Sequence, residues 1–230
     1  MSWLESPLLA LDTETTGTDP ESARIVTMCA GVSPRPGVWE PTSWRVNPGI
    51  PIPAGASAVH GITDEDVATE PSGAAALAPI WDHLAAHASL PIVGHNLAYD
   101  MTVLDREFRR HLGKGVPEGI RCIDTLVLFR RFDFTTGGRQ LEHLANRYGI
   151  SLNAHDSSDD ALASLRILHV LASENDLLPL VGVDDLQPLQ AKWYAAHIEA
   201  ARQKRISRGQ DAPPESTDWP IRHYPERTAA

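Results

Sequence analysis

The chain has 230 residues, of which 42% are hydrophobic and 22% are charged. These values predict one globular domain with an appendage and argue against wholesale disorder. Cys29 and Cys122 are far apart in the sequence, which argues against a disulfide framework or a cysteine zinc site and favours the reducing cytoplasm. The sequence shows neither a signal-peptide pattern nor an apolar run of about 18 residues, so we expect no secretion and no membrane contact.

The formal net charge of −10 argues against a nucleic-acid partner, because proteins that bind nucleic acids are usually basic. Bound divalent cations could reverse the sign of a carboxylate cluster locally. Basic residues also gather in three stretches: Arg106, Arg109, Arg110 and Lys114; Arg130 and Arg131; and Arg202, Lys204, Arg205 and Arg208. Each stretch is as compatible with a solvated helix face as with a contact to nucleic acid.

The predicted elements are three strands followed by helix–strand units. Apolar runs bounded by Pro and Gly predict strands at residues 7–12, 25–32, 38–46, 91–94 and 120–124. Helical spacing predicts helices at residues 71–88, 97–112, 125–129, 140–148, 158–173 and 186–206. The Pro- and Gly-rich stretch 47–59 predicts a loop. This order predicts an α/β fold with a mixed sheet flanked by helices.

The character of the chain changes beyond residue 180. We expect a main domain at residues 1–180, a C-terminal helix at 181–208 and an irregular tail at 209–230. The preferred interpretation of the helix is packing against the domain, with Trp193 in the contact.

Two acidic residues follow the first apolar run. If that strand continues far enough, Asp12 and Glu14 share a face with Leu8 and Ala10, because side chains alternate along a strand. The two carboxylates would then repel each other and burial would add a desolvation cost, and a cation would relieve both penalties. The alternative is that the strand stops at Asp12 and that Glu14 is solvated.

A third acid borders a helical apolar stripe. The stripe consists of Leu97, Met101, Leu104 and Phe108. Asn96 is a candidate N-cap for this helix, and Asp100 lies in its first turn beside the stripe. An unpaired carboxylate there is costly and implies a partner; the alternative is an acid that stabilises the helix dipole.

A fourth acid, Asp160, borders the apolar face of the helix at 158–173. The alternative role is a capping box formed by Ser157 and Asp160. His155 lies about 140° from Asp160 on an ideal helix, so we expect it on the preceding loop. A histidine there titrates near neutral pH and is close to the acids. Oxygen ligands without cysteine favour Mg²⁺ or Mn²⁺ over zinc.

Three motifs occur in order: Asp12-Thr13-Glu14-Thr15-Thr16-Gly17, His95-Asn96-x-x-x-Asp100 and His155-x-x-x-x-Asp160. Together they resemble the motifs of the DnaQ-like (DEDDh) 3′–5′ exonucleases, which include the proofreading epsilon subunit of bacterial DNA polymerase III, RNase T and oligoribonuclease. His60-Gly61-Ile62-Thr63 resembles the connecting loop of that family, and Asp124-Thr125 resembles a pair in its fifth strand. The resemblance covers residues 7–175.

The resemblance implies a ribonuclease H-like fold with a five-stranded mixed sheet, and it makes residues 1–180 an exonuclease domain. It implies that four acids, Asp12, Glu14, Asp100 and Asp160, bind two Mg²⁺ or Mn²⁺ ions and that His155 is the general base. The expected substrate-binding residues are Thr13, Thr15, Thr16, His60 and Asn96. The expected reaction removes nucleoside 5′-monophosphates from the free 3′ end of single-stranded DNA, in proofreading or repair.

Two alternatives to this function stay open at this point. The substrate could be RNA, since nothing in the sequence tests a 2′-hydroxyl. The chain could instead be a non-catalytic adaptor that docks a DNA polymerase through helix 186–206 and through Trp219, Ile221 and Tyr224. No polymerase-docking motif stands out, so a proofreading role does not follow from the sequence.

Overall fold

A computed structural model describes residues 3–133 and 137–224 of the chain. Its strands are β1 (Leu8–Thr15), β2 (Ile25–Ser33), β3 (Ser43–Arg45), β4 (Ile92–Gly94) and β5 (Cys122–Asp124). They form one sheet in the order β3-β2-β1-β4-β5. β1 is antiparallel to β2 and parallel to β4, so the sheet is mixed, and the predicted fold class is confirmed.

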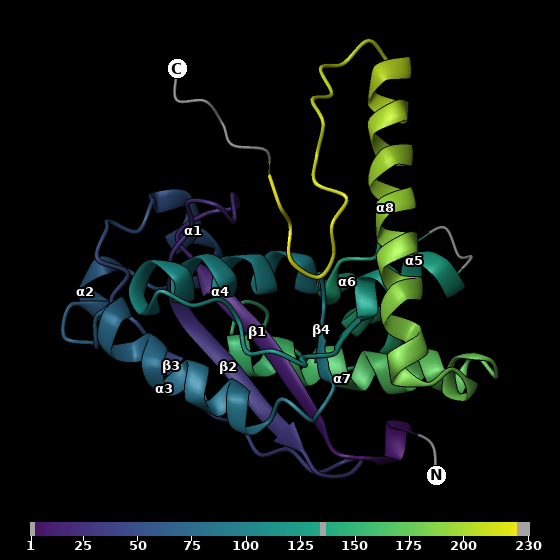
Figure 1. Cartoon of the computed structure of the whole chain (residues 1–230), viewed down its shortest axis with the longest axis horizontal. Helices are drawn as coiled ribbons and strands as arrows, with labels where there is room; N and C mark the ends of the chain where they lie inside the picture. The colour runs from purple at the N-terminus through teal and green to yellow at the C-terminus, as the bar shows by residue number, and fades with distance from the viewer. Residues whose placement is uncertain (1–2, 134–136, 225–230) are drawn as a thin grey trace.

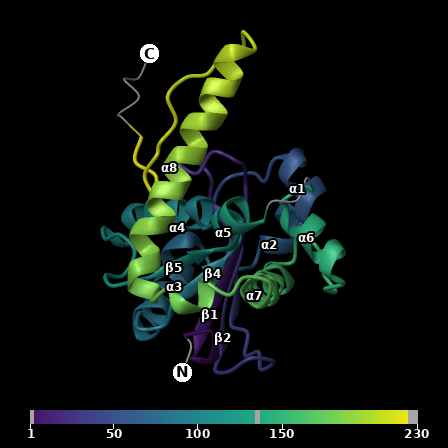
Figure 2. The same ribbon diagram turned by 90° about the vertical axis from the view of Figure 1, so that its right-hand side faces the viewer.

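Helices cover both faces of this sheet (Figures 1 and 2). They are α1 (Ala54–His60), α2 (Asp64–Val67), α3 (Gly73–Ala86), α4 (Leu97–Leu112), α5 (Thr125–Phe132), α6 (Leu141–Tyr148), α7 (Ser157–Ser173) and α8 (Val183–Ser207). Leu9 and Leu11 of β1 face a core shared with α3 and α4. Leu8 and Ala10 face the opposite core, which is shared with α7. The alternation predicted for the first strand therefore sets the two layers.

Two predicted elements are wrong in extent or kind. The strand expected at 38–46 is reduced to β3, because Pro41 has no N–H for a regular ladder; upstream of it, only an isolated bridge joins Glu40 to Val32. The stretch 47–59, expected as a loop, contains most of α1, which starts directly after Pro53. Proline is compatible with a helix start, so the prolines of this stretch exclude a helix only upstream of Ala54.

α8 covers the edge of the sheet at β5. Its buried Gln190 accepts a hydrogen bond from the Asp124 N–H (2.8 Å) and donates one to the Cys122 carbonyl (2.9 Å). Gln187 accepts from the Cys122 N–H at 3.0 Å. Trp193 packs among the apolar residues of this contact, which confirms the preferred interpretation for the first half of α8.

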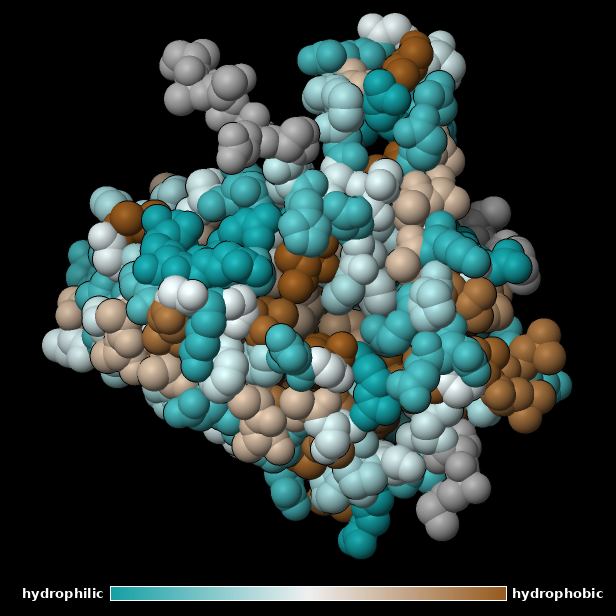
Figure 3. Space-filling model, in the orientation of Figure 1, coloured by the Kyte–Doolittle hydropathy of each residue, from teal (hydrophilic) through white to brown (hydrophobic). Residues whose placement is uncertain are grey.

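The second half of α8 projects beyond the sheet, and hydrophilic residues cover much of the projecting end (Figures 1 and 3). Residues 208–224 return from that end toward α4 and contain no helix or strand. Within the described ranges, no helix is both long enough and apolar enough to cross a membrane.

Candidate active site

The C-terminal end of β1 and the N-terminal turns of α4 and α7 meet at a cleft of about 470 Å³. The cleft is lined by all four predicted acids and the predicted histidine: Asp12, Glu14, Asp100, His155 and Asp160. The structure therefore brings together residues from three elements that are far apart in the sequence.

β1 continues past both of its acids to Thr15. Asp12 and Glu14 therefore share the face of Leu8 and Ala10, and the alternative of a solvated Glu14 is wrong: Glu14 is 9% exposed. The pairing with β2 shifts register between Glu14 and Thr15. Such an irregularity changes the direction of side chains at the end of a strand, here at the rim of the cleft.

Asp100 lies in the first turn of α4 and is 4% exposed. It accepts a hydrogen bond of 2.6 Å from the Thr13 hydroxyl, which ties α4 to β1. Asn96 precedes α4 as predicted, but its side chain makes no capping bond. Its backbone is left-handed (φ 69°), and its N–H donates to Asp124 Oδ1 at 3.0 Å.

The N-cap of α7 is Asp156, whose side chain accepts from the N–H groups of Ser158 and Asp159. The alternative role of Asp160, a capping box with Ser157, is therefore excluded, and Asp160 does not cap the helix. Asp160 Oδ2 accepts from the His155 N–H at 3.2 Å. Its Oδ1 is buried and has no hydrogen-bond partner among the residues that the structure describes.

His155 lies on the loop before α7, as predicted, and it is exposed. Its backbone is left-handed, with φ 67°, which is uncommon for a residue other than glycine. Glu14, His155 and Asp160 each offer one ligand atom, and these three atoms lie within 4.8 Å of one another. Asp12 and Asp100 line the same cleft outside this triplet.

The four carboxyl groups strongly disfavour being charged together. Burial raises the pKa of Glu14 to about 8, with further increases from Asp160 and Asp100. Burial also raises the pKa of Asp100 to about 7 and that of Asp160 to about 6. The pKa of Asp12 is raised by burial and by its three acidic neighbours. A divalent cation would favour the charged forms and remove this repulsion.

The five predicted substrate-binding residues, Thr13, Thr15, Thr16, His60 and Asn96, line an adjoining pocket of about 660 Å³. Two of the threonines also hold the loop after β1. The Thr15 hydroxyl donates to the Gly17 carbonyl at 2.9 Å, and the Thr16 hydroxyl accepts from the Arg24 N–H at 3.0 Å.

His60 closes another side of this pocket. His60 Nδ1 accepts from the Ile62 N–H at 3.1 Å. Its Nε2 is buried and, within the described part of the chain, makes no hydrogen bond of regular geometry; burial lowers the pKa of this histidine, and the nearby Thr15 backbone partly offsets that effect. Thr13 and Asn96 line both the pocket and the cleft, so the two spaces are continuous.

Several cleft residues were not predicted as site residues. His95 Nε2 lies 2.8 Å from the Arg139 carbonyl, and burial lowers the pKa of this histidine to about 4, so it is neutral. Tyr99 lines both spaces and hydrogen-bonds to Thr15. The position of His95 inside a motif could have indicated it. No sequence signal indicated Arg222, which lines the pocket from the C-terminal segment.

The fold and this carboxylate–histidine cleft define the class of ribonuclease H-like exonucleases. Residues 9–168 match the family model described as "RNase_T: Exonuclease", and the chain belongs to this family. The family predicted from the three motifs is therefore confirmed.

Two curated relatives carry polymerase names. The "DNA polymerase III subunit epsilon-like protein" of Rhodobacter capsulatus is 33% identical over 184 residues, covering 73% of this chain and 25% of the relative. The "DNA polymerase III subunit epsilon" of Treponema pallidum is 27% identical, covering 72% of this chain and 76% of the relative. The match thus spans about a quarter of the length of the first relative and about three quarters of the second.

Solved structures share the fold at lower identity. E. coli exonuclease I in complex with a dT13 oligonucleotide has a TM-score of 0.63 and 22% identity, covering 75% of this chain and 42% of that one. Exonuclease X in complex with 5′ overhanging duplex DNA has a TM-score of 0.59 and 21% identity, covering 80% of this chain and 99% of that one.

Proposed function

We propose that this chain is a 3′–5′ exonuclease that hydrolyses single-stranded DNA from a free 3′ end to nucleoside 5′-monophosphates. The observation that carries the proposal is the convergence of four acids and His155 from three distant elements in one cleft. DNA is favoured over RNA by the relatives named for DNA polymerase III and by the structural neighbours named with DNA.

We propose that Asp12, Glu14, Asp100 and Asp160 hold two Mg²⁺ or Mn²⁺ ions. The donor set consists of carboxylate oxygens with one nearby imidazole, which suits hard divalent cations. Asp160 Oδ1 has no hydrogen-bond partner among the described residues, and the pKa values of Glu14 and Asp160 are raised. Both observations are expected of a carboxylate site that binds cations. When bound, such ions would neutralise the phosphodiester charge and make a nearby water molecule more acidic.

In this proposal His155 is the general base. A neutral imidazole at the mouth of the cleft can take the proton of the attacking water. The bond from the His155 N–H to Asp160 holds the loop against α7. His155 is an exposed residue, so a substrate in the cleft can reach it.

We assign the terminal nucleotide to the adjoining pocket, with Thr13, Thr15, Thr16, His60 and Asn96 as binding residues. The buried Nε2 of His60 supports this assignment, because a buried polar atom without a regular hydrogen bond is costly unless a ligand satisfies it. The continuity of the pocket with the cleft supports placing the scissile phosphate beside the acids.

The division into an exonuclease domain at 1–180, a helix at 181–208 and a tail at 209–230 stays a prediction, as does a cytoplasmic location. We also propose a DNA polymerase as a partner, on the basis of the relatives' names. Trp219 and Ile221 pack against the core shared by α3 and α4, so the projecting half of α8 is the better surface for such a partner. The last six residues of the predicted tail, 225–230, lie outside the described residues.

The decisive experiment compares the wild type with Asp12→Ala on single-stranded DNA and RNA oligomers of the same sequence, with Mg²⁺. We expect the wild type to release mononucleotides from DNA faster than from RNA, and Asp12→Ala to release none. Asp82→Ala, which removes an exposed acid on α3, is the matched control. Digestion at the wild-type rate by Asp12→Ala would refute the assignment, and faster digestion of RNA would change the substrate class.

A further inference from the structure

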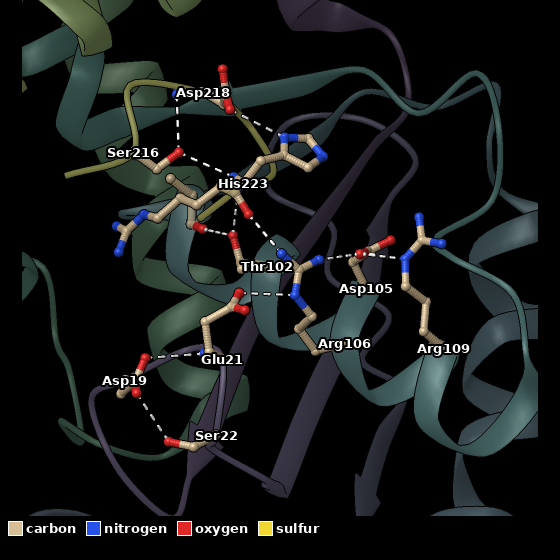
Figure 4. Close-up of polar contacts among 12 residues, drawn as sticks. Asp19, Glu21, Ser22, Thr102, Asp105, Arg106, Arg109, Ser216, Asp218 and His223 are labelled. Atoms are coloured by element: carbon tan, nitrogen blue, oxygen red, sulfur yellow. Dashed lines mark hydrogen bonds and ion pairs between the residues drawn. The ribbon is translucent and has the colours of Figure 1, made fainter. Parts of the chain in front are cut away.

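The segment 216–223, here called the C-terminal strap, comes down to α4 and turns back against it (Figures 1 and 4). The Arg222 N–H donates to the Thr102 hydroxyl of α4 at 2.9 Å. Arg106 Nη2, also on α4, donates to the Arg222 carbonyl at 2.9 Å. Both main-chain polar groups of Arg222 are thus paired with one helix, which fixes where its side chain begins.

Further contacts hold the strap in a defined conformation. The Ser216 hydroxyl accepts hydrogen bonds from the N–H groups of Asp218 (3.3 Å) and His223 (3.1 Å), which close it into a compact turn (Figure 4). Trp219 and Ile221 pack against the apolar core that α3 and α4 share. Trp219 Nε1 also donates to Oδ2 of Asp124, the N-cap of α5, at 3.5 Å.

These anchors place the Arg222 side chain on the wall of the 660 Å³ pocket, together with Thr15 and Tyr99. Among the described residues, Arg222 is the only Arg or Lys that lines this pocket. Its Nε is buried and has no hydrogen-bond partner in the described ranges. Burial lowers the pKa of Arg222, but hydrogen bonds and charge interactions with the Tyr194 and Tyr224 side chains raise it overall, so the guanidinium stays charged while these tyrosines engage part of it.

Two arginines of α4, Arg106 and Arg110, are engaged in ion pairs, whereas Arg130 and Arg139 line the adjoining cleft and not this pocket. Arg106 pairs with Glu21 at 2.8 Å and with Asp105 at 2.6 Å. Arg110 pairs with Glu107. The basic stretch that contains them is therefore largely neutralised by its own neighbours, and Arg222 supplies the positive charge that faces the pocket.

We propose that Arg222 binds a phosphate group of the 3′-terminal nucleotides, so that the C-terminal strap is a working part of the substrate site. This inference rests on the proposed function. It assigns a substrate contact to a residue that lies outside residues 9–168, the part of the chain that matches the exonuclease family. The strap would thereby offset, at one position, a net charge of −10 that opposes nucleic-acid binding.

The test uses the full chain and a hydrolysis-resistant phosphorothioate oligothymidylate, whose binding is measured at several salt concentrations. Loss of one phosphate contact reduces the slope of log affinity against log salt by about 0.7 for a single strand. We expect this reduction in Arg222→Gln, together with a roughly tenfold higher KM for digestion of the ordinary oligonucleotide and little change in kcat. Arg222→Lys, which keeps the charge, should retain the wild-type slope.

Arg35→Gln is the matched control. It removes the same charge from an exposed turn after β2, next to the start of β1 and therefore at the opposite end of the sheet from the cleft. If Arg222→Gln has the same salt slope and the same KM as Arg35→Gln, and the wild type digests DNA, the inference is wrong and the proposed function stands. If Arg222→Lys reduces the slope of log affinity against log salt as much as Arg222→Gln does, the positive charge is not what matters and Arg222 acts only in packing. That result also overturns the inference. A wild type that neither binds nor digests the oligonucleotide would refute the proposed function itself.

Discussion

The N–H of His155 donates to Asp160 Oδ2 across 3.2 Å, so a main-chain bond links the proposed base to a proposed metal ligand. This bond does not involve the imidazole, and it should survive substitution of the side chain. The position of Asp160 should therefore be unchanged when the His155 ring is removed.

We accordingly predict that His155→Asn slows hydrolysis by about a hundredfold or more while DNA binding stays near the wild-type level. Asparagine tolerates the left-handed backbone at this position, so the loss reports on the ring. Single-turnover digestion and oligonucleotide binding would measure the two effects. An equal loss of both would make His155 a substrate contact and not a base.

Stability of the metal-free protein should fall as the pH rises from about 4 to about 8. The folded protein holds protons on Glu14, with a pKa of about 8, and on Asp100, with a pKa of about 7, whereas the unfolded chain releases them near 4. The folded state thus binds more protons within this window, and raising the pH removes that stabilisation.

Cations compete with these protons, so added Mn²⁺ should raise the melting temperature more at pH 8 than at pH 6. Thermal melts in chelator and in Mn²⁺ at both values would measure this difference. Glu14→Gln should flatten the pH dependence of the metal-free protein. A Mn²⁺ effect that is larger at pH 6 would contradict the proposed carboxylate ligands.

Asn96 offers a test that separates backbone from side chain. Its left-handed conformation costs an ordinary residue about 1 kcal/mol or more, a penalty that glycine avoids. Asn96→Ala should therefore unfold at lower denaturant concentration than Asn96→Gly. If the side chain binds substrate, both variants should show a similarly raised KM. Equal stability of the two variants would mean that the turn relaxes on substitution.

Gln190 and Gln187 make similar bonds to β5 but differ in burial. Gln190 is fully buried, so Gln190→Leu leaves the Asp124 N–H and the Cys122 carbonyl without that partner, at a cost of about 1–3 kcal/mol. Gln187 is partly exposed, and water can replace it in Gln187→Leu, which should cost less. Urea unfolding would compare the two free energies. A larger loss for Gln187→Leu would show that burial does not decide the effect.

The sequence was most informative where one local pattern had a single outcome. The alternation in β1 placed Asp12 and Glu14 on one face, and the helical stripe placed Asp100 beside the core. The order of elements then determined the mixed sheet. These features depend on periodicities of two and 3.6 residues, which do not require knowledge of distant contacts.

Features that depend on competing local groups or on distant contacts were predicted poorly. Asp156 displaced Ser157 as the cap of α7, because either side chain could serve in a sequence rich in Asp and Ser. The tail was expected to be irregular, and irregular backbone gave no reason to expect a residue in the substrate pocket. The place of Arg222 depends on Thr102 and Arg106, which precede it by more than a hundred residues.

The two glutamines that cover β5 have a consequence for self-association. An edge strand with unpaired amides invites another polypeptide to add a strand, which is a common route to aggregates. Here side chains from α8 occupy amide and carbonyl groups of Cys122 and the amide of Asp124. Residues that lie beyond the segment matched by the family model therefore protect the edge of the sheet from pairing with a strand of another molecule. A chain truncated before α8 would expose this edge and should aggregate more readily.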